Sequence, residues 1–228
     1  MAIVLEDGKT TQIISVIGIP QCDIVYYLAR ALNSIKKTVL VIDNSRYHEL
    51  FKSIPKPDGE KMVQTGNIYY IENIKYSEDF FAQYDFVIVY HGMDIRDELS
   101  AVSDYRYIQT DYSPITTERL EKELSRQEDT LKYHVIFRNK VSGKIQEKMI
   151  LRELGILEKN VKEAYVMSLN EVDEMCQLFL LRNGSIKTRS CSAEIRDFIN
   201  AVYITIYPDI TSKLQKNYMK AFLSGKIR

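Results

Sequence analysis

The sequence predicts an α/β fold with three layers, in which helices on both faces cover a mostly parallel sheet. Apolar runs of four to seven residues alternate along the chain with segments of helical periodicity, which is typical of βαβ units. The runs are apolar at nearly every position, as in strands covered on both faces. No linker, internal repeat or low-complexity tract interrupts the 228 residues, so we expect a single domain over residues 1–228.

The expected elements follow the apolar pattern in chain order. The strands are residues 13–18, 39–43, 67–72, 86–90, 107–110, 134–138 and 163–167. The helices are residues 23–33, 45–53, 116–127, 144–154, 170–181 and 192–207. Several of these helices begin with Ser, Thr, Asp or Asn, which commonly cap helix N-termini. Prolines and glycines predict a loop over residues 55–66.

The last segment predicts an amphipathic helix at about residues 209–224. Apolar residues recur there at three- and four-residue steps, and lysines occupy other positions. Two interpretations stay open. The helix docks on its own domain or on a second protein, or it contacts a membrane through its apolar stripe and basic residues, which include Lys226 and Arg228.

Composition limits the classes of partner and compartment. Lys plus Arg and Asp plus Glu each number 31, so the net charge is zero and no overall field attracts nucleic acid or anionic lipid. Three cysteines give neither a metal-binding spacing nor an even disulfide framework, and the first residues lack the pattern of a signal peptide. We therefore expect a cytoplasmic protein, with a peripheral position at the inner face of the membrane as the alternative, and no bound nucleic acid.

Residues 12–43 resemble the opening of the MinD/ParA group of P-loop ATPases. In that group a strand leads into the turn Lys-Gly-Gly-Val-Gly-Lys-Thr-Thr, a helix with Asn-Leu-Ala and a strand Val-Leu-Leu-Ile-Asp. Here residues 12–18 are the first strand, Leu28-Ala29 matches the helix, and Val39-Leu40-Val41-Ile42-Asp43 matches the second strand. The resemblance implies the P-loop ATPase fold of this group.

The resemblance continues to about residue 207. Residues 85–90 look like the strand Asp-Phe-Val-Ile-Ile-Asp, but Tyr90 replaces the last Asp, which touches the magnesium shell in the group. Residues 107–114 are similar to Val-Val-Thr-Thr-Pro-Glu-Pro. Residues 134–141 resemble Val-Val-Leu-Asn-Lys-Val, whose Asn commonly faces adenine and matches Asn139 within one residue.

The groups that bind phosphate in this family are missing. A P-loop needs glycines, a lysine and a hydroxyl that holds magnesium. With Leu28-Ala29 aligned, Gln21 replaces the lysine, and Cys22 and Asp23 replace the hydroxyl residues. A carboxylate at this helix N-terminus repels a triphosphate. We therefore interpret Pro20 and Asp23 as residues that start and cap a helix.

Two further expectations concern the same loop. If an unusual nucleotide pocket exists instead, the resemblance places it at Gly18, Pro20, Gln21, Cys22 and Asp23, together with Asp43 and Asn139. Asp43 matches an acidic residue that orients water and magnesium in the group, but it is also an ordinary cap. We expect the side chains of Gln21, Tyr26 and Tyr27 to narrow or block the site.

Other candidate residues give weaker patterns. His91 with Asp94 has the composition of a base and its orienting carboxylate, but we expect a loop there, because no nucleophile can be placed beside them. Cys22 at a helix N-terminus is a candidate thiolate, although Asp23 beside it opposes that. No group of residues has the spacing of a metal site.

The sequence therefore favours a catalytically inactive MinD/ParA-like scaffold or localisation protein without a cofactor. The resemblance implies protein contacts in a bacterial assembly, with a protein partner or a homodimer, as in division, partition or Flp/Tad pilus relatives. The alternative is an atypical ATPase that binds ATP and magnesium and dimerises on nucleotide. A third hypothesis is a flavodoxin-like or glycosyltransferase-like protein that binds another ligand at the same sheet edge.

Overall fold

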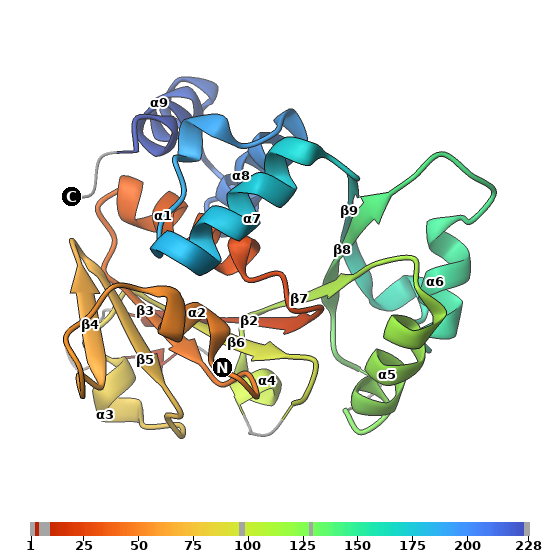
Figure 1. The fold of residues 1–228 in the computed structure, drawn as a ribbon, viewed down its shortest axis with the longest axis horizontal. Coiled ribbons are helices and arrows are strands. Elements are labelled where there is room, and N and C mark those ends of the chain that lie inside the picture. Colours follow the sequence, from red (N-terminus) through yellow and green to blue (C-terminus); the bar gives the residue numbers. More distant parts are fainter. Residues whose placement is uncertain (1–2, 5–9, 96–98, 128–129, 226–228) are drawn as a thin grey trace.

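The computed structural model describes residues 3–4, 10–95, 99–127 and 130–225, and these contain one nine-stranded sheet (Figure 1). The strand order is β4-β5-β3-β6-β2-β7-β8-β9, and β1 pairs with β2 outside this path. The pairs β1–β2 and β4–β5 are antiparallel, and the others are parallel. The strands are β1 Ile3–Val4, β2 Thr10–Gly18, β3 Val39–Asp43, β4 Met62–Thr65, β5 Ile68–Glu72, β6 Phe86–Gly92, β7 Tyr105–Thr110, β8 Tyr133–Lys140 and β9 Val161–Ser168.

Helices cover both faces of this sheet. They are α1 Asp23–Ser34, α2 Glu49–Ser53, α3 Glu78–Phe81, α4 Leu99–Val102, α5 Pro114–Leu124, α6 Glu147–Glu153, α7 Glu171–Asn183, α8 Ala193–Ile206 and α9 Ser212–Leu223, with 3-10 turns η1 Glu158–Asn160 and η2 Thr188–Ser190. Figure 1 shows α1, α7, α8 and α9 grouped over one face. The three-layer α/β architecture expected from the sequence is confirmed.

The alternation of side chains along β2 shows how the two faces are filled. Ile14 and Val16 belong to the core beneath α1, α7, α8 and α9. Ile13 packs into the core that includes residues of α3 and α4, and Ile17 into the core under α5 and α6. Because successive residues of a strand point to opposite faces, β2 is buried on both sides. This explains why its sequence is almost continuously apolar.

The sequence and the structure differ at several short segments. The loop expected over residues 55–66 is wrong for Met62–Thr65, which form the edge strand β4 and pair with β5 after a turn at Gly66, whose φ is 62°. α2 begins at Glu49 rather than at residue 45, because the side chain of Asp43 holds the preceding residues in a turn. The short helices α3 and α4 were not expected.

The C-terminal helix packs on the domain. Phe222 of α9 is 1% exposed, and its ring centroid lies 6.2 Å from that of Tyr27 on α1. Thr188 Oγ1 donates to the Phe222 carbonyl oxygen at 2.6 Å, and Arg30 Nη2 donates to the Gly225 carbonyl oxygen at 2.6 Å. Of the two interpretations of α9, these contacts favour docking on its own domain. Lys226 and Arg228 lie outside the described residues.

None of the helices in the described ranges has both the length and the apolar character needed to cross a bilayer.

Candidate functional site

The candidate site lies at the carboxyl end of β2, in the loop of residues 19–22 that leads into α1. After β2 the chain continues to β3 on one side of the sheet, and after β6 it continues to β7 on the other side. Ligands of open parallel sheets bind at such a reversal of strand order. Residues 18–23 therefore lie at the edge of the sheet where ligands of such folds bind.

The loop is fixed against β7 by backbone and side-chain hydrogen bonds. Gly18 has a φ of 140°, and a Cβ atom there would lie 1.8 Å from the carbonyl oxygen of Gln109. The same oxygen accepts from Ile19 N at 3.0 Å, while Gln109 Nε2 donates to the Gln21 carbonyl oxygen at 3.0 Å. The glycine thus allows close contact with β7, whereas a P-loop uses its glycines to turn amides toward phosphate.

The start of α1 is already engaged by another part of the chain. Asp23 is the first helical residue, and its backbone amide donates to Gln177 Oε1 on α7 at 3.0 Å. Free amides at a helix N-terminus bind anions. Here one of them is satisfied by a neutral side chain of the protein itself.

Asp23 forms a buried ion pair rather than a cap. Its Oδ2 accepts from Arg138 Nη2 at 3.0 Å, and the two side chains are 0% and 2% exposed. Burial raises the pKa of the Asp23 carboxyl, and the charge of Arg138 opposes this. The expectation that Asp23 caps α1 is wrong, since Cys22 holds the cap position without a side-chain bond and Pro20 lies before the helix, exposed. The arginine charge is neutralised by the protein's own carboxylate.

Asp43 uses both carboxylate oxygens for turns that follow β3. Oδ1 accepts from Ser45 N at 3.1 Å and from Ser45 Oγ at 2.6 Å, and Oδ2 accepts from Phe51 N in the first turn of α2 at 2.9 Å. This is the capping role, one of the two roles that the sequence allows. Burial raises the pKa of Asp43, and these hydrogen bonds oppose the shift.

Tyr90 occupies the position where the MinD/ParA group has its second acidic residue. Its side chain is 1% exposed, and its hydroxyl donates to the carbonyl oxygen of Ile19 at 3.4 Å. Burial raises the pKa of this phenol well above its ordinary value, so the group stays neutral. It therefore ties β6 to the loop.

The other residues expected at the site are separated by the fold. Gln21 Nε2 donates to Glu174 Oε1 on α7 at 3.3 Å, so Gln21 lies at the loop as expected. Tyr26 and Tyr27 are buried in the core, and Tyr27 faces α9. Asn139, with a φ of 57°, lies at the carboxyl end of β8, where the register with β9 shifts.

The expected loop at His91 is wrong, because β6 extends to Gly92. His91 is fully buried, and its Nε2 lies 3.0 Å from Ser15 Oγ, which in turn lies 2.7 Å from Ser103 Oγ. Asp94 forms an ion pair with Arg119 at 2.9 Å. The contacts of His91 belong to the packing of β2 and β6 against the segment after α4, and the pair of Asp94 links the loop after β6 to α5. Cys22 is likewise buried, which raises the pKa of its thiol far above the range of a reactive thiolate.

A nucleoside triphosphate with magnesium does not fit the groups that line this loop. Residues 18–23 contain no lysine and no hydroxyl side chain. The charge of Arg138 and the amide of Asp23 are both engaged within the protein. Across the described ranges, no group of three or more His, Cys, Asp or Glu side chains could hold a metal ion.

Comparison with solved structures identifies the fold as MinD/ParA-like. A ParA family ATPase from Chlorobium tepidum TLS aligns over 93% of this chain and 98% of its own, with 12% identity and a TM-score of 0.54. MinD cell division protein from Aquifex aeolicus aligns over 95% and 98%, with 12% identity and a TM-score of 0.55. The MinC:MinD cell division protein complex from Aquifex aeolicus aligns over 94% of this chain and 96% of its own, with 12% identity and a TM-score of 0.52. No protein-family model and no curated protein matches the sequence.

Proposed function

We propose that this protein is a scaffold or localisation protein that has the MinD/ParA-like fold and does not hydrolyse nucleotide. The observation that carries the proposal is the set of contacts around Asp23. The backbone amide of Asp23 donates to Gln177, and Arg138 donates to the Asp23 carboxylate, so both groups that could bind a phosphate are engaged within the protein. Electrostatic stabilisation is the main catalytic contribution in phosphoryl transfer, and this loop supplies none.

The function would then depend on contact surfaces. Among the structural neighbours, MinD is a cell division protein that is solved in a complex with MinC. By analogy, this chain would act in a bacterial assembly through a protein partner or a second copy of itself. The buried, free Cys22, Cys176 and Cys191 agree with a reducing, cytoplasmic compartment. A peripheral membrane contact would have to use the part of α9 that is not packed on α1.

The protein should release no phosphate from ATP or GTP above background in the presence of magnesium. The reason is that the loop has no cation for the developing charge, and Asp43 is held by Ser45 and Phe51. A phosphate-release assay on the purified chain checks this, with Asp43→Asn as the matched variant because an amide keeps the size of the side chain. Turnover that the wild type shows and the folded variant loses would overturn the proposal.

A further inference from the structure

α7 exposes large apolar side chains on the face that points away from the domain. Its buried residues are Asp173, Cys176, Gln177 and Leu180. Its exposed apolar residues are Val172, Met175, Leu178, Phe179 and Leu181, which are 38% to 51% exposed. A helix at a protein surface normally has polar residues there. A contiguous exposed apolar patch of this kind indicates an interaction site.

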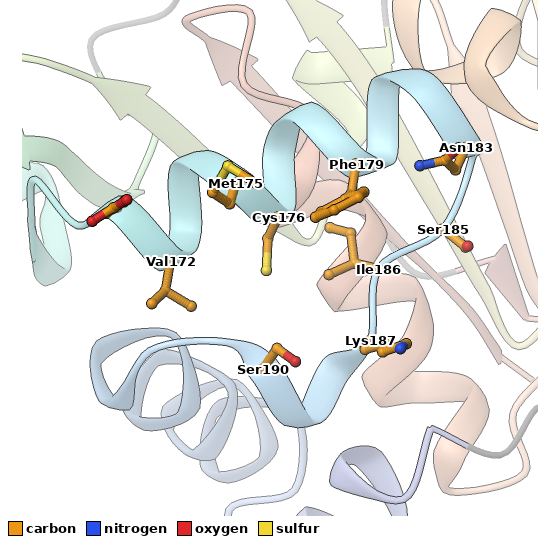
Figure 2. Close-up of a pocket in the computed structure, with 10 residues that line it drawn as sticks. Val172, Met175, Cys176, Phe179, Asn183, Ser185, Ile186, Lys187 and Ser190 are labelled. Atoms are coloured by element: carbon orange, nitrogen blue, oxygen red, sulfur yellow. The ribbon is translucent and has the colours of Figure 1, made fainter.

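A hollow lies beside this face, between α7 and the segment that contains η2. Its volume is about 660 Å³, and its lining includes Val172, Phe179, Ile186 and Lys187. Figure 2 shows Val172 projecting from α7 toward this hollow, with Lys187 and Ser190 on the opposite side. The apolar face is therefore bordered by a groove that can receive side chains from a partner.

The charges and the apolar residues on α7 are arranged symmetrically about its middle. Glu171, Met175, Leu178 and Arg182 follow one another at steps of four, three and four, so they form one line along the helix. This line lies opposite the buried face. Neither Glu171 nor Arg182 forms an ion pair with another residue that the structure describes.

A second copy of α7, placed antiparallel, matches this line. With a two-fold axis between positions 176 and 177, Glu171 lies opposite Arg182 of the second copy, and Met175 lies opposite its Leu178. A two-fold interface requires a patch that is complementary to itself, and this line satisfies that requirement in both charge and apolar character.

We propose that α7 is the interface of a homodimer, in which the two copies of the helix pair antiparallel. This proposal identifies the partner, a second copy of the chain, that the proposed function leaves open. It rests on the proposed function in one respect, namely that the protein acts through contact surfaces. The thirteen residues of α7 span about 20 Å. Such a helix pair buries less than the roughly 800 Å² per partner of a standard interface. We therefore expect a reversible dimer with a dissociation constant on the order of 10 to 100 μM.

A charge swap tests the pairing. Glu171→Arg alone and Arg182→Glu alone each place two pairs of like charges at the interface, so each variant should dimerise at least about tenfold more weakly. An equimolar mixture of the two variants should regain dimers of nearly wild-type affinity, because each heterodimer has two pairs of opposite charges. Sedimentation velocity between about 5 and 500 μM measures this, a range that brackets the expected dissociation constant.

Two controls separate this interface from a loss of folding and from nonspecific charge effects. Glu118→Arg on α5 makes the same charge change at an exposed site and should leave dimerisation unchanged. Leu178→Glu should abolish the dimer while the melting temperature of the monomer stays close to that of the wild type. A wild-type chain that stays monomeric at 500 μM, or a mixture that does not regain dimers, would overturn the proposal. Neither result would alter the proposal that the protein does not hydrolyse nucleotide. Dimers that form only with ATP would contradict that proposed function instead.

Discussion

Phe222→Ala should lower the free energy of unfolding by about 3–5 kcal/mol, the range for removing a buried aromatic side chain from a packed core. The ring is 1% exposed and packs against Tyr27, so its loss leaves a cavity between α9 and α1. Urea denaturation followed by circular dichroism measures the change. Its magnitude reports whether α9 is a structural part of the domain.

Leu214→Ala is the matched control, because it removes an apolar side chain from the same helix at a position that is 41% exposed. We expect it to cost less than about 1 kcal/mol. If the two substitutions had equal small effects, α9 would not be docked on α1. The apolar stripe of the helix would then be available for a membrane or another protein.

Arg138→Met should lower the free energy of unfolding by about 3–5 kcal/mol at neutral pH, because it leaves the Asp23 carboxylate buried without its partner. The double variant Asp23→Leu with Arg138→Met should recover most of this loss, since it removes the unpaired charge. Chemical denaturation of both variants measures the difference. Lys122→Ala, which breaks the exposed pair with Glu118, should leave the free energy of unfolding nearly unchanged.

The pH dependence of the Arg138→Met variant gives an independent check. Without the arginine, burial raises the folded-state pKa of Asp23 further above its ordinary value of 3.8. A carboxyl whose pKa is raised by folding contributes to stability fully below pH 3.8, the ordinary value. This contribution to the free energy of unfolding is lost as the pH rises through the folded-state pKa. The deficit of the variant relative to the wild type should therefore grow between about pH 4 and neutrality. A deficit independent of pH would mean that Asp23 is not an unpaired buried carboxylate in the variant.

The sequence was sufficient to place the central strands and the longer helices along the chain. β3 is apolar throughout because β5 and β6 flank it and both its faces are covered, so its run predicts a buried strand directly. β4 was missed because its four residues are only partly buried at the sheet edge, which leaves a weak pattern. Hydrophobic pattern thus identifies central strands better than edge strands.

The candidate site was predicted only in part. The absence of a lysine between residues 18 and 23 is visible in the sequence, and it predicts a departure from a P-loop. The groups that engage Asp23 were not visible, because Arg138 and Gln177 are 115 and 154 residues away along the chain. The one local signal was a charged residue at the end of the apolar strand 134–138. Contacts at this separation are set by tertiary packing.

The exposed face of α7 also required the structure. Apolar residues occur on several sides of this helix, so its sequence alone does not show which of them are exposed. Its position at the edge of the helical layer leaves Met175, Leu178 and Phe179 about half exposed. These residues therefore contribute to the candidate dimer surface.

Calorimetric titration of the intact chain with ATP and Mg²⁺ tests most directly whether this MinD/ParA-like fold lacks a working nucleotide site. We expect no saturable heat at nucleotide concentrations up to about 5 mM, well above typical substrate constants, and no change in melting temperature. Saturable binding of one nucleotide per chain that raises the melting temperature, with the β- and γ-phosphates held by residues 18–23 in a crystal of the complex, would contradict this conclusion. Such binding would require the side chain of Gln177 to move away from the backbone amide of Asp23.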